Sequence, residues 1–279
     1  PRQTMKDASG ASQMDPRTQV SSLYGTSMLD AAQYSLESNV SLALLHEPGG
    51  RNDQALVNVA IGAHLNLHGQ PALAAAQAAR QAGNAPNTVL AMAAGVVGPA
   101  AQGNARSAAR QLIDAFTAAG LDSALDDGFD AGRVKVADAS LFSGSDVDGK
   151  AQAMLAGLEA RGAKSVFVRW LKAQPGHPTA DGVLAAITTT LAWGPLSRKR
   201  ISRLTAESLP WWMRLFGALI GASVPAEGHQ PGSFARIAEA DILNRRSLGE
   251  IAFTALFGFA PPSEADLFAF QLLVGMLMT

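Results

Sequence analysis

Proline and glycine divide the first 120 residues of this sequence into short segments of similar length. Between these breaks Ala and Leu dominate, and both favour helix because they lose little side-chain entropy in it. Proline stands where the first turn of a helix tolerates its missing N–H. The pattern predicts a chain of short helical hairpins, with helices over 27–45, 53–67, 71–82, 86–97 and 105–119.

The second half of the chain continues the helical pattern. Helices are expected over 150–160, 179–193, 210–222, 234–244, 247–257 and 263–279. The polar residues 1–22 are predicted to be a flexible N-terminal arm. A linker at 225–231 is predicted to separate a helical module, residues 23–225, from a further helical segment, residues 226–279. The last apolar run ends without Gly or Pro, as if a helix were cut.

Residues 120–148 depart from this pattern. An acidic loop is followed by an alternating stretch at 133–137, which predicts a short strand, and a second strand is expected at 165–169. With the helix at 150–160 these strands would form a βαβ unit. A Gly-rich phosphate fingerprint is missing, which argues against a nucleotide fold. The expected class is therefore mainly α, with at most a few short strands.

Composition limits the chemistry. The chain has no cysteine, which removes disulfides, zinc thiolates and thiol nucleophiles and suits a reducing, cytoplasmic location. A net charge of −1 argues against nucleic acid and anionic membranes as partners. The apolar run at 211–224 contains Arg214 and is too short to span a bilayer. Only 16% of residues are charged, which suggests burial between subunits, as a homodimer or larger oligomer.

Histidine and arginine supply the candidate site residues. His64 and His68 share one helical face without a neighbouring acid, so no metal site is predicted. His177 lies in a Gly-Pro loop four residues before Asp181, either as an acid/base pair or with Asp181 or a neighbouring threonine as a helix cap. Arg200 and its neighbours form a basic cluster, either a solvated surface or a site for carboxylate or CoA phosphate.

One internal similarity links distant parts of the chain. Residues 48–66 match residues 261–279 at a constant shift of 213, and the match pairs a proline, an aspartate and a glycine. In both copies a turn leads into a helix with an acidic start and an apolar remainder. Both a chance match and an internal repeat are consistent with three identities in an Ala- and Leu-rich sequence.

Several motifs resemble the citrate synthase and citryl-CoA lyase superfamily. The run 98–105, GPAAQGNA, is similar to its GP-x-HGGA turn, and 176–178, GHP, to its second histidine loop. The run 181–186, DGVLAA, looks like the start of the helix that carries the catalytic aspartate. The segment 247–266 resembles the beginning of such a module, which in the family would continue beyond Thr279. The resemblance covers most of residues 30–279.

The resemblance implies a citrate-synthase-like multi-helical assembly that acts on a CoA thioester and forms or cleaves a C–C bond with a keto acid. No bound cofactor is implied, since the CoA thioester is a substrate. Asp181 would remove the α-proton, Gln102 would polarise the thioester carbonyl and His177 would stabilise the keto oxygen. Substrate carboxylates would be held by His68, Arg200 and Arg203.

Two departures from the family pattern support a different interpretation. Gln102 stands where the family has its first catalytic histidine, and glutamine cannot change charge near neutral pH. His177 and Asp181 are also much closer in sequence than in the family. The alternative is a non-catalytic structural or regulatory helical module that retains the scaffold.

Overall fold

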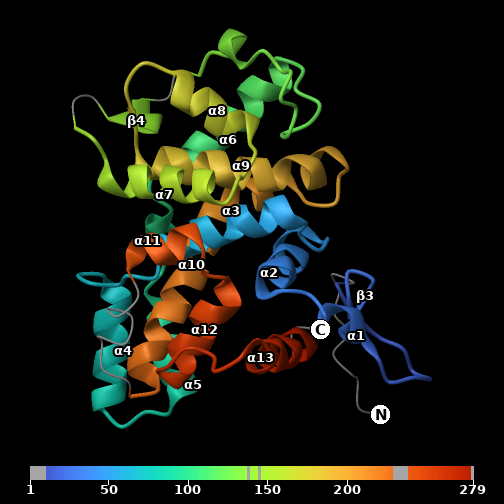
Figure 1. The fold of residues 1–279 in the computed structure, drawn as a ribbon, viewed down its shortest axis with the longest axis vertical. Helices are drawn as coiled ribbons and strands as arrows, with labels where there is room; N and C mark the ends of the chain where they lie inside the picture. The colour runs from blue at the N-terminus through green and yellow to red at the C-terminus, as the bar shows by residue number, and fades with distance from the viewer. Residues whose placement is uncertain (1–10, 137–138, 144–145, 229–237, 278–279) are drawn as a thin grey trace.

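The computed structural model describes residues 11–136, 139–143, 146–228 and 238–277, and in them the fold is mainly α-helical (Figure 1). The α-helices are α1 Met28–Ala31, α2 Leu36–Leu45, α3 Arg51–Gly62, α4 Pro71–Gln81, α5 Pro86–Gly95, α6 Ala105–Ala118, α7 Gly149–Ala160, α8 Val166–Ala173, α9 Ala180–Ser197, α10 Arg203–Ala226, α11 Glu239–Asn244, α12 Leu248–Phe257 and α13 Glu264–Leu277. Short 3₁₀ helices are η1 Pro99–Gln102, η2 Ala131–Arg133 and η3 Ala139–Leu141.

The strands are few and short. Residues 12–27 form an antiparallel meander, in which β2 Ser21–Leu23 pairs with both β1 Ser12–Met14 and β3 Thr26–Ser27. The described part of the predicted flexible arm, residues 11–22, therefore contains β1 and the first two residues of β2. A second antiparallel pair joins β4 Phe142–Ser143 to β5 His177–Pro178.

The helices that follow the Pro and Gly breaks form near their predicted positions, but the first expected helix is divided. Helix α3 ends at Gly62 rather than at Leu67, so the prediction that His64 and His68 share a helical face is wrong. The predicted helix over 27–45 is two helices, α1 and α2, because the chain turns between them. Ser35 ends this turn as the N-cap of α2, and its Oγ accepts from the Ser38 N–H at 3.2 Å. The apolar periodicity does not show this boundary, but Ser35, a residue type that favours N-caps, marks it.

The predicted βαβ unit is wrong. Residues 166–173 form helix α8, capped by Ser165, whose Oγ accepts from Val168 N–H at 3.0 Å. The buried positions 166, 167, 170 and 171 recur at helical spacing, and this periodicity outweighs the local β-branched character. Arg133 ends η2, and residues 134–136 form no strand; residue 137 lies outside the described residues.

The larger hydrophobic core surrounds α9, which crosses the middle of the molecule (Figure 1). Every residue from Gly182 to Trp193 is buried, because α3, α6, α7, α8 and α10 all pack against this helix. A smaller core lies between α4, α5 and α10. The long helix α10 thus contributes to both cores and connects them.

The end of the chain repeats the local structure of its beginning. The helices α11, α12 and α13 follow one another as α1, α2 and α3 do. Ser35 and Ser247 cap the second helix of each triplet, and its C-cap is left-handed at both His46 (φ 64°) and Gly258 (φ 78°). These equivalent positions are 212 residues apart, so the sequence similarity is accompanied by the same order of caps and helices.

The two helix triplets also pack against each other reciprocally. A Cβ on Gly62 of α3 would lie 3.2 Å from side chains of α11, and one on Gly275 of α13 would lie 2.5 Å from the Ala31 carbonyl oxygen of α1. The N–H of Leu248 donates to Glu37 Oε1 of the first triplet at 2.7 Å, and that of Leu36 donates to α13. Each triplet therefore supplies packing contacts and a hydrogen-bond acceptor to the other.

The predicted linker at 225–231 begins inside α10, which continues to Ala226; residues 229–237, including part of the predicted helix 234–244, lie outside the described residues. Beyond them α11 packs on α3 and α7, and α12 packs on α10. In the described part of the chain, no helix is both long and apolar enough to cross a membrane.

Candidate functional site

Asp181 lies in the first turn of α9, where neighbouring side chains fix the helix start. Thr179 is the N-cap: its Oγ1 accepts from Gly182 N–H at 3.0 Å and donates to the Ser140 carbonyl at 2.7 Å. Asp148 caps α7 with one carboxylate oxygen and accepts from the Ala180 N–H with the other, at 2.7 Å. These contacts hold α7 and α9 together at the residue before Asp181.

The turn at 101–104 meets Asp181, although 77 residues separate Asn104 from it. The N–H of Asn104 donates to Asp181 Oδ2 at 2.8 Å. Gly103 has a positive φ of 54°, and a Cβ there would lie 2.6 Å from the same oxygen. Only glycine therefore allows the turn to approach the carboxylate so closely. The sequence-predicted site residues Gln102 and Asp181 are brought to one place.

Arg214 of α10 joins this place to α3. Its guanidinium donates to Asp181 Oδ1, to the Ala101 carbonyl oxygen and, from Nε, to His64 Nε2 at 3.3 Å. The side chains of Arg214 and Asp181 are only 17% and 23% exposed, so their ion pair is largely removed from water. We call Asp181, Arg214, His64 and Gln102 the Asp181 cluster and include Lys150 of α7, because its charge acts on His64 and its own pKa responds to Arg214 and Asp181.

His64 is buried at the end of α3 and is held neutral. Its Nδ1–H donates to the Ala60 carbonyl at 2.8 Å, which leaves Nε2 as the acceptor for Arg214. Burial lowers the pKa of His64 to about 3, and the positive charges of Lys150 and Arg214 act in the same direction. Burial, together with Arg214, also lowers the pKa of Lys150.

Gln102 ends η1 beside this ion pair and is buried, with 9% of its surface exposed. None of the described residues donates a hydrogen bond to its Oε1. An unpaired amide oxygen in a buried polar site is costly and is uncommon unless a ligand or water satisfies it. The Asp181 cluster thus combines an anion, cations in an apolar surround and an amide with unused hydrogen-bonding capacity.

The remaining predicted site residues do not join the Asp181 cluster. His177 is exposed in β5, which precedes the N-cap of α9, and His68 is exposed in the loop before α4. Arg200 pairs with Glu47 at 3.5 Å. Arg203 pairs with Asp114 at 2.7 Å and with Glu207 at 2.8 Å, and these hydrogen bonds raise the pKa of its guanidinium. Both arginines already have carboxylate partners from the chain itself.

Sequence reasoning missed the central roles of Arg214 and His64. The sequence does carry a signal, because Arg214 is the only charged residue in the apolar run 211–224. A single charge in such a run is usually paired when the helix is buried. His64 was not assigned to the candidate site, because its partner Arg214 lies 150 residues away in the sequence.

Comparison of this chain with protein-family models, curated proteins and solved structures finds no match. Among the described residues, no group of three or more His, Asp and Glu side chains is placed to hold a metal ion. The Asp181 cluster is therefore a candidate site on the evidence of its own contacts and charges, without support from a similar protein.

Proposed function

We propose that this chain is a citrate-synthase-like enzyme that acts on a CoA thioester and forms or cleaves a C–C bond with a keto acid. The observation that carries the proposal is the meeting of the 101–104 turn with Asp181. These are the two motif positions at which the resemblance requires an oxygen-stabilising group and a base. Their approach is as close as a glycine permits, 2.6 Å from a Cβ position to the carboxylate.

The charges around Asp181 also support a site of chemistry. Burying an ion pair in a helical core seldom adds stability, since desolvation offsets the attraction. Titratable groups with shifted pKa values cluster at functional sites, and here both His64 and Lys150 are shifted downward by burial. A purely structural contact between α9 and α10 needs none of these groups.

In the proposed reaction the carboxylate of Asp181 takes a proton from the α-carbon of the thioester. The resulting enolate oxygen accepts a hydrogen bond from the Gln102 amide, and the α-carbon attacks the keto carbon. The keto oxygen then takes a proton from solvent, and His177 in β5 is the residue that the resemblance assigns to stabilise this oxygen. Each oxygen of Asp181 accepts one bond in the structure and has a further lone pair.

The experiment is deuterium exchange into the methyl group of acetyl-CoA in D₂O, followed by mass spectrometry. The chain should accelerate exchange above the buffer rate, and Asp181→Asn should abolish the acceleration because the amide cannot take the proton. Asp127→Asn, at an exposed carboxylate paired with Lys164, is the matched control and should exchange normally. Exchange at the buffer rate, or full exchange in Asp181→Asn, would remove the assigned role.

The second candidate is a non-catalytic structural or regulatory module that retains the scaffold. It is favoured by the same carboxylate, since Asp181 joins α9, α10 and the 101–104 turn through bonds to both oxygens. It predicts no heat with millimolar CoA or acetyl-CoA in calorimetry, together with a loss of stability in Asp181→Asn. A binding signal that disappears in Asp181→Asn, while the helical circular dichroism is retained, favours the enzyme.

The proposal carries with it a cytoplasmic location, acyl-CoA and carboxylate partners and a homodimer or larger oligomer. The lack of cysteine and the small share of charged residues support the first and the last of these. Light scattering of the purified chain measures the oligomer directly, and a monomer at micromolar concentration would contradict that part.

A further inference from the structure

Helix α13 is apolar almost all round, yet little of it is fully buried. From Leu267 to Leu277 it contains no charged residue, and in the described part of α13 only Gly275 is buried. The side chains of Phe268 and Leu273 are 53% and 57% exposed, and that of Leu277 is 78% exposed. A helix of this composition is normally buried, and contiguous exposed apolar side chains mark an interaction surface.

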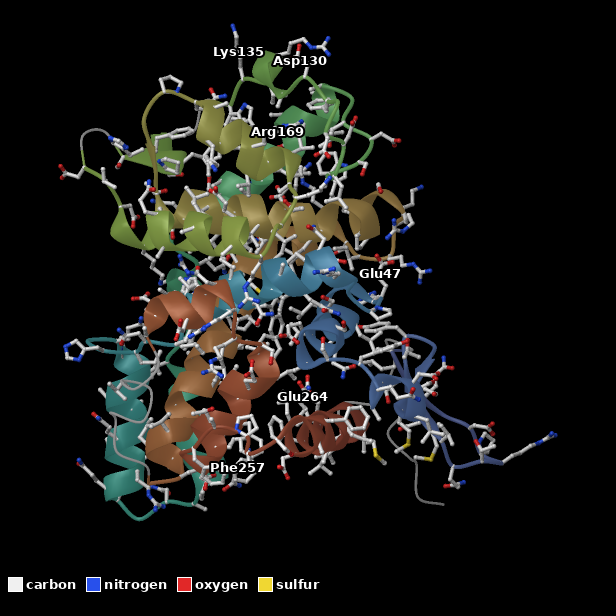
Figure 2. All side chains as sticks on the ribbon, viewed as in Figure 1. Glu47, Asp130, Lys135, Arg169, Phe257 and Glu264 are labelled. Atoms are coloured by element: carbon white, nitrogen blue, oxygen red, sulfur yellow. The ribbon has the colours of Figure 1, made fainter. Side chains whose placement is uncertain are left out.

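The exposed surface extends beyond α13. Phe257 at the end of α12 and Phe259 in the following loop are 47% and 54% exposed. Phe259 packs edge to face with Phe253, Phe257 packs edge to face with Phe270, and the rings of Phe253 and Phe257 are tilted by 44°. Figure 2 shows Phe257 in the lower part of the molecule and Glu264 above it, where α12 leads into α13.

The equivalent helix of the first triplet, α3, is in the opposite situation. Every residue from Ala55 to Gly62 is buried. Two sets of neighbours cover it. One set consists of α2, α11 and α12, and the other of α7, α9 and α10.

The contacts of α13 reproduce the first of these sets. It packs against α12, α1 and α2, which correspond to α2, α11 and α12 around α3. The contacts that α3 makes with α7, α9 and α10 have no counterpart among the principal contacts of α13 in the described residues. The face of α13 that is exposed is therefore the face that a second body of helices would cover.

We propose that the exposed face of α13 is the docking surface for a helical body built like residues 67–226 of this chain. In this body an apolar helix like α9 lies against α13 as α9 lies against α3. The partner presents an uncharged face, since α13 offers no charge after Asp266. A second copy of this chain does not provide that face, because its own α3 already occupies it.

The test fuses residues 67–226 of this chain to its own end, so that a helical body of known sequence can cover α13. One fusion joins residues 67–226 after Thr279, at the position that Asn66 holds in the internal repeat. A second fusion also replaces residues 264–279 by residues 51–66, which removes any mismatch of side chains. Hydrogen exchange of the peptide that covers the α13 position is compared with that of the unfused chain.

The expected result is a slowing of amide exchange in this peptide by at least about tenfold in one or both fusions. Ile187→Asp in the appended copy is the control, because it places a charge at the fully buried centre of the appended α9 and should restore fast exchange. Unchanged exchange in both fusions overturns the proposal. So does protection of α13 in the unfused chain that rises with its concentration, which would identify a second copy as the occupant.

Discussion

The titration of His64 should make the free energy of unfolding of this protein depend on pH between about 3 and 6.5. In the folded chain this histidine is buried between the Ala60 carbonyl and the guanidinium of Arg214, and its pKa is about 3. In the unfolded chain it takes the ordinary value of 6.5. Above this value both states hold a neutral ring, so His64 contributes no pH dependence there.

The sign and size of the effect follow from proton uptake. As the pH falls below 6.5, the unfolded chain binds a proton at His64 and the folded chain does not, so the free energy of unfolding decreases until the pH approaches about 3. One unit of pKa difference corresponds to about 1.4 kcal/mol, so the change from pH 7 to pH 5 costs about 2 kcal/mol at this residue.

The assay is urea unfolding, followed by circular dichroism, of the native chain and of His64→Gln at both pH values. Glutamine keeps an acceptor for Arg214 but does not titrate. The native chain should lose about 2 kcal/mol more than the variant between pH 7 and pH 5, since every other titrating group is common to both. Equal losses in the two proteins would refute the assignment of a neutral, buried His64.

Three further predictions concern an ion pair, a packing contact and a helix cap, and each is measured as the free energy of unfolding in urea. Arg214→Met should cost about 3–5 kcal/mol because it leaves the largely buried carboxylate of Asp181 without its ion-pair partner. Lys164→Met, at the exposed ion pair with Asp127, should cost less than about 1 kcal/mol. Equal costs would contradict the burial of the Arg214–Asp181 pair. Gly217→Ala places a Cβ 2.8 Å from the His64 side chain and should destabilise the protein by about 1–3 kcal/mol. Its control, Gly95→Ala, places a Cβ in open space and should stabilise the protein by up to about 1 kcal/mol. A stabilising Gly217→Ala would show that α10 can move away from His64. Ser247→Ala removes the N-cap of α12 and should cost about 1 kcal/mol, and no change would mean that the cap bond is not formed in solution.

Helix positions were predictable because their ends are written in the local sequence. Pro71 and Pro86 stand at the first residue of α4 and α5, where proline is tolerated and its fixed φ suits a helix. The run 165–169 misled because its β-branched residues are also compatible with a strand over five positions. Only a longer window, which includes Trp170 and Leu171, reveals the helical spacing of the buried face.

The candidate site was only partly predictable, for a different reason. Gln102 and Asp181 belong to motifs, and the structure places them together. Arg214 and His64 belong to none, and they acquire their roles through contacts over 33 and 150 residues of sequence. The sequence indicates that the lone charge of Arg214 is paired, but composition and spacing do not show which distant residues it contacts. Burial decides these contacts, and it depends on how α3, α9 and α10 pack.

The reciprocal packing of the two helix triplets sets the order in which this chain can finish folding. Helix α1 has its main helical neighbour in α13, and α3 meets α11, so the first triplet is incomplete until the last residues exist. At a synthesis rate of about 5–20 residues per second, the offset between equivalent residues corresponds to a wait of about 10–40 s. Contacts between such distant segments also slow folding. During that interval Gly62 and its neighbours on α3 lack their cover from α11, so apolar surface that is buried in the finished fold stays exposed at the beginning of the chain.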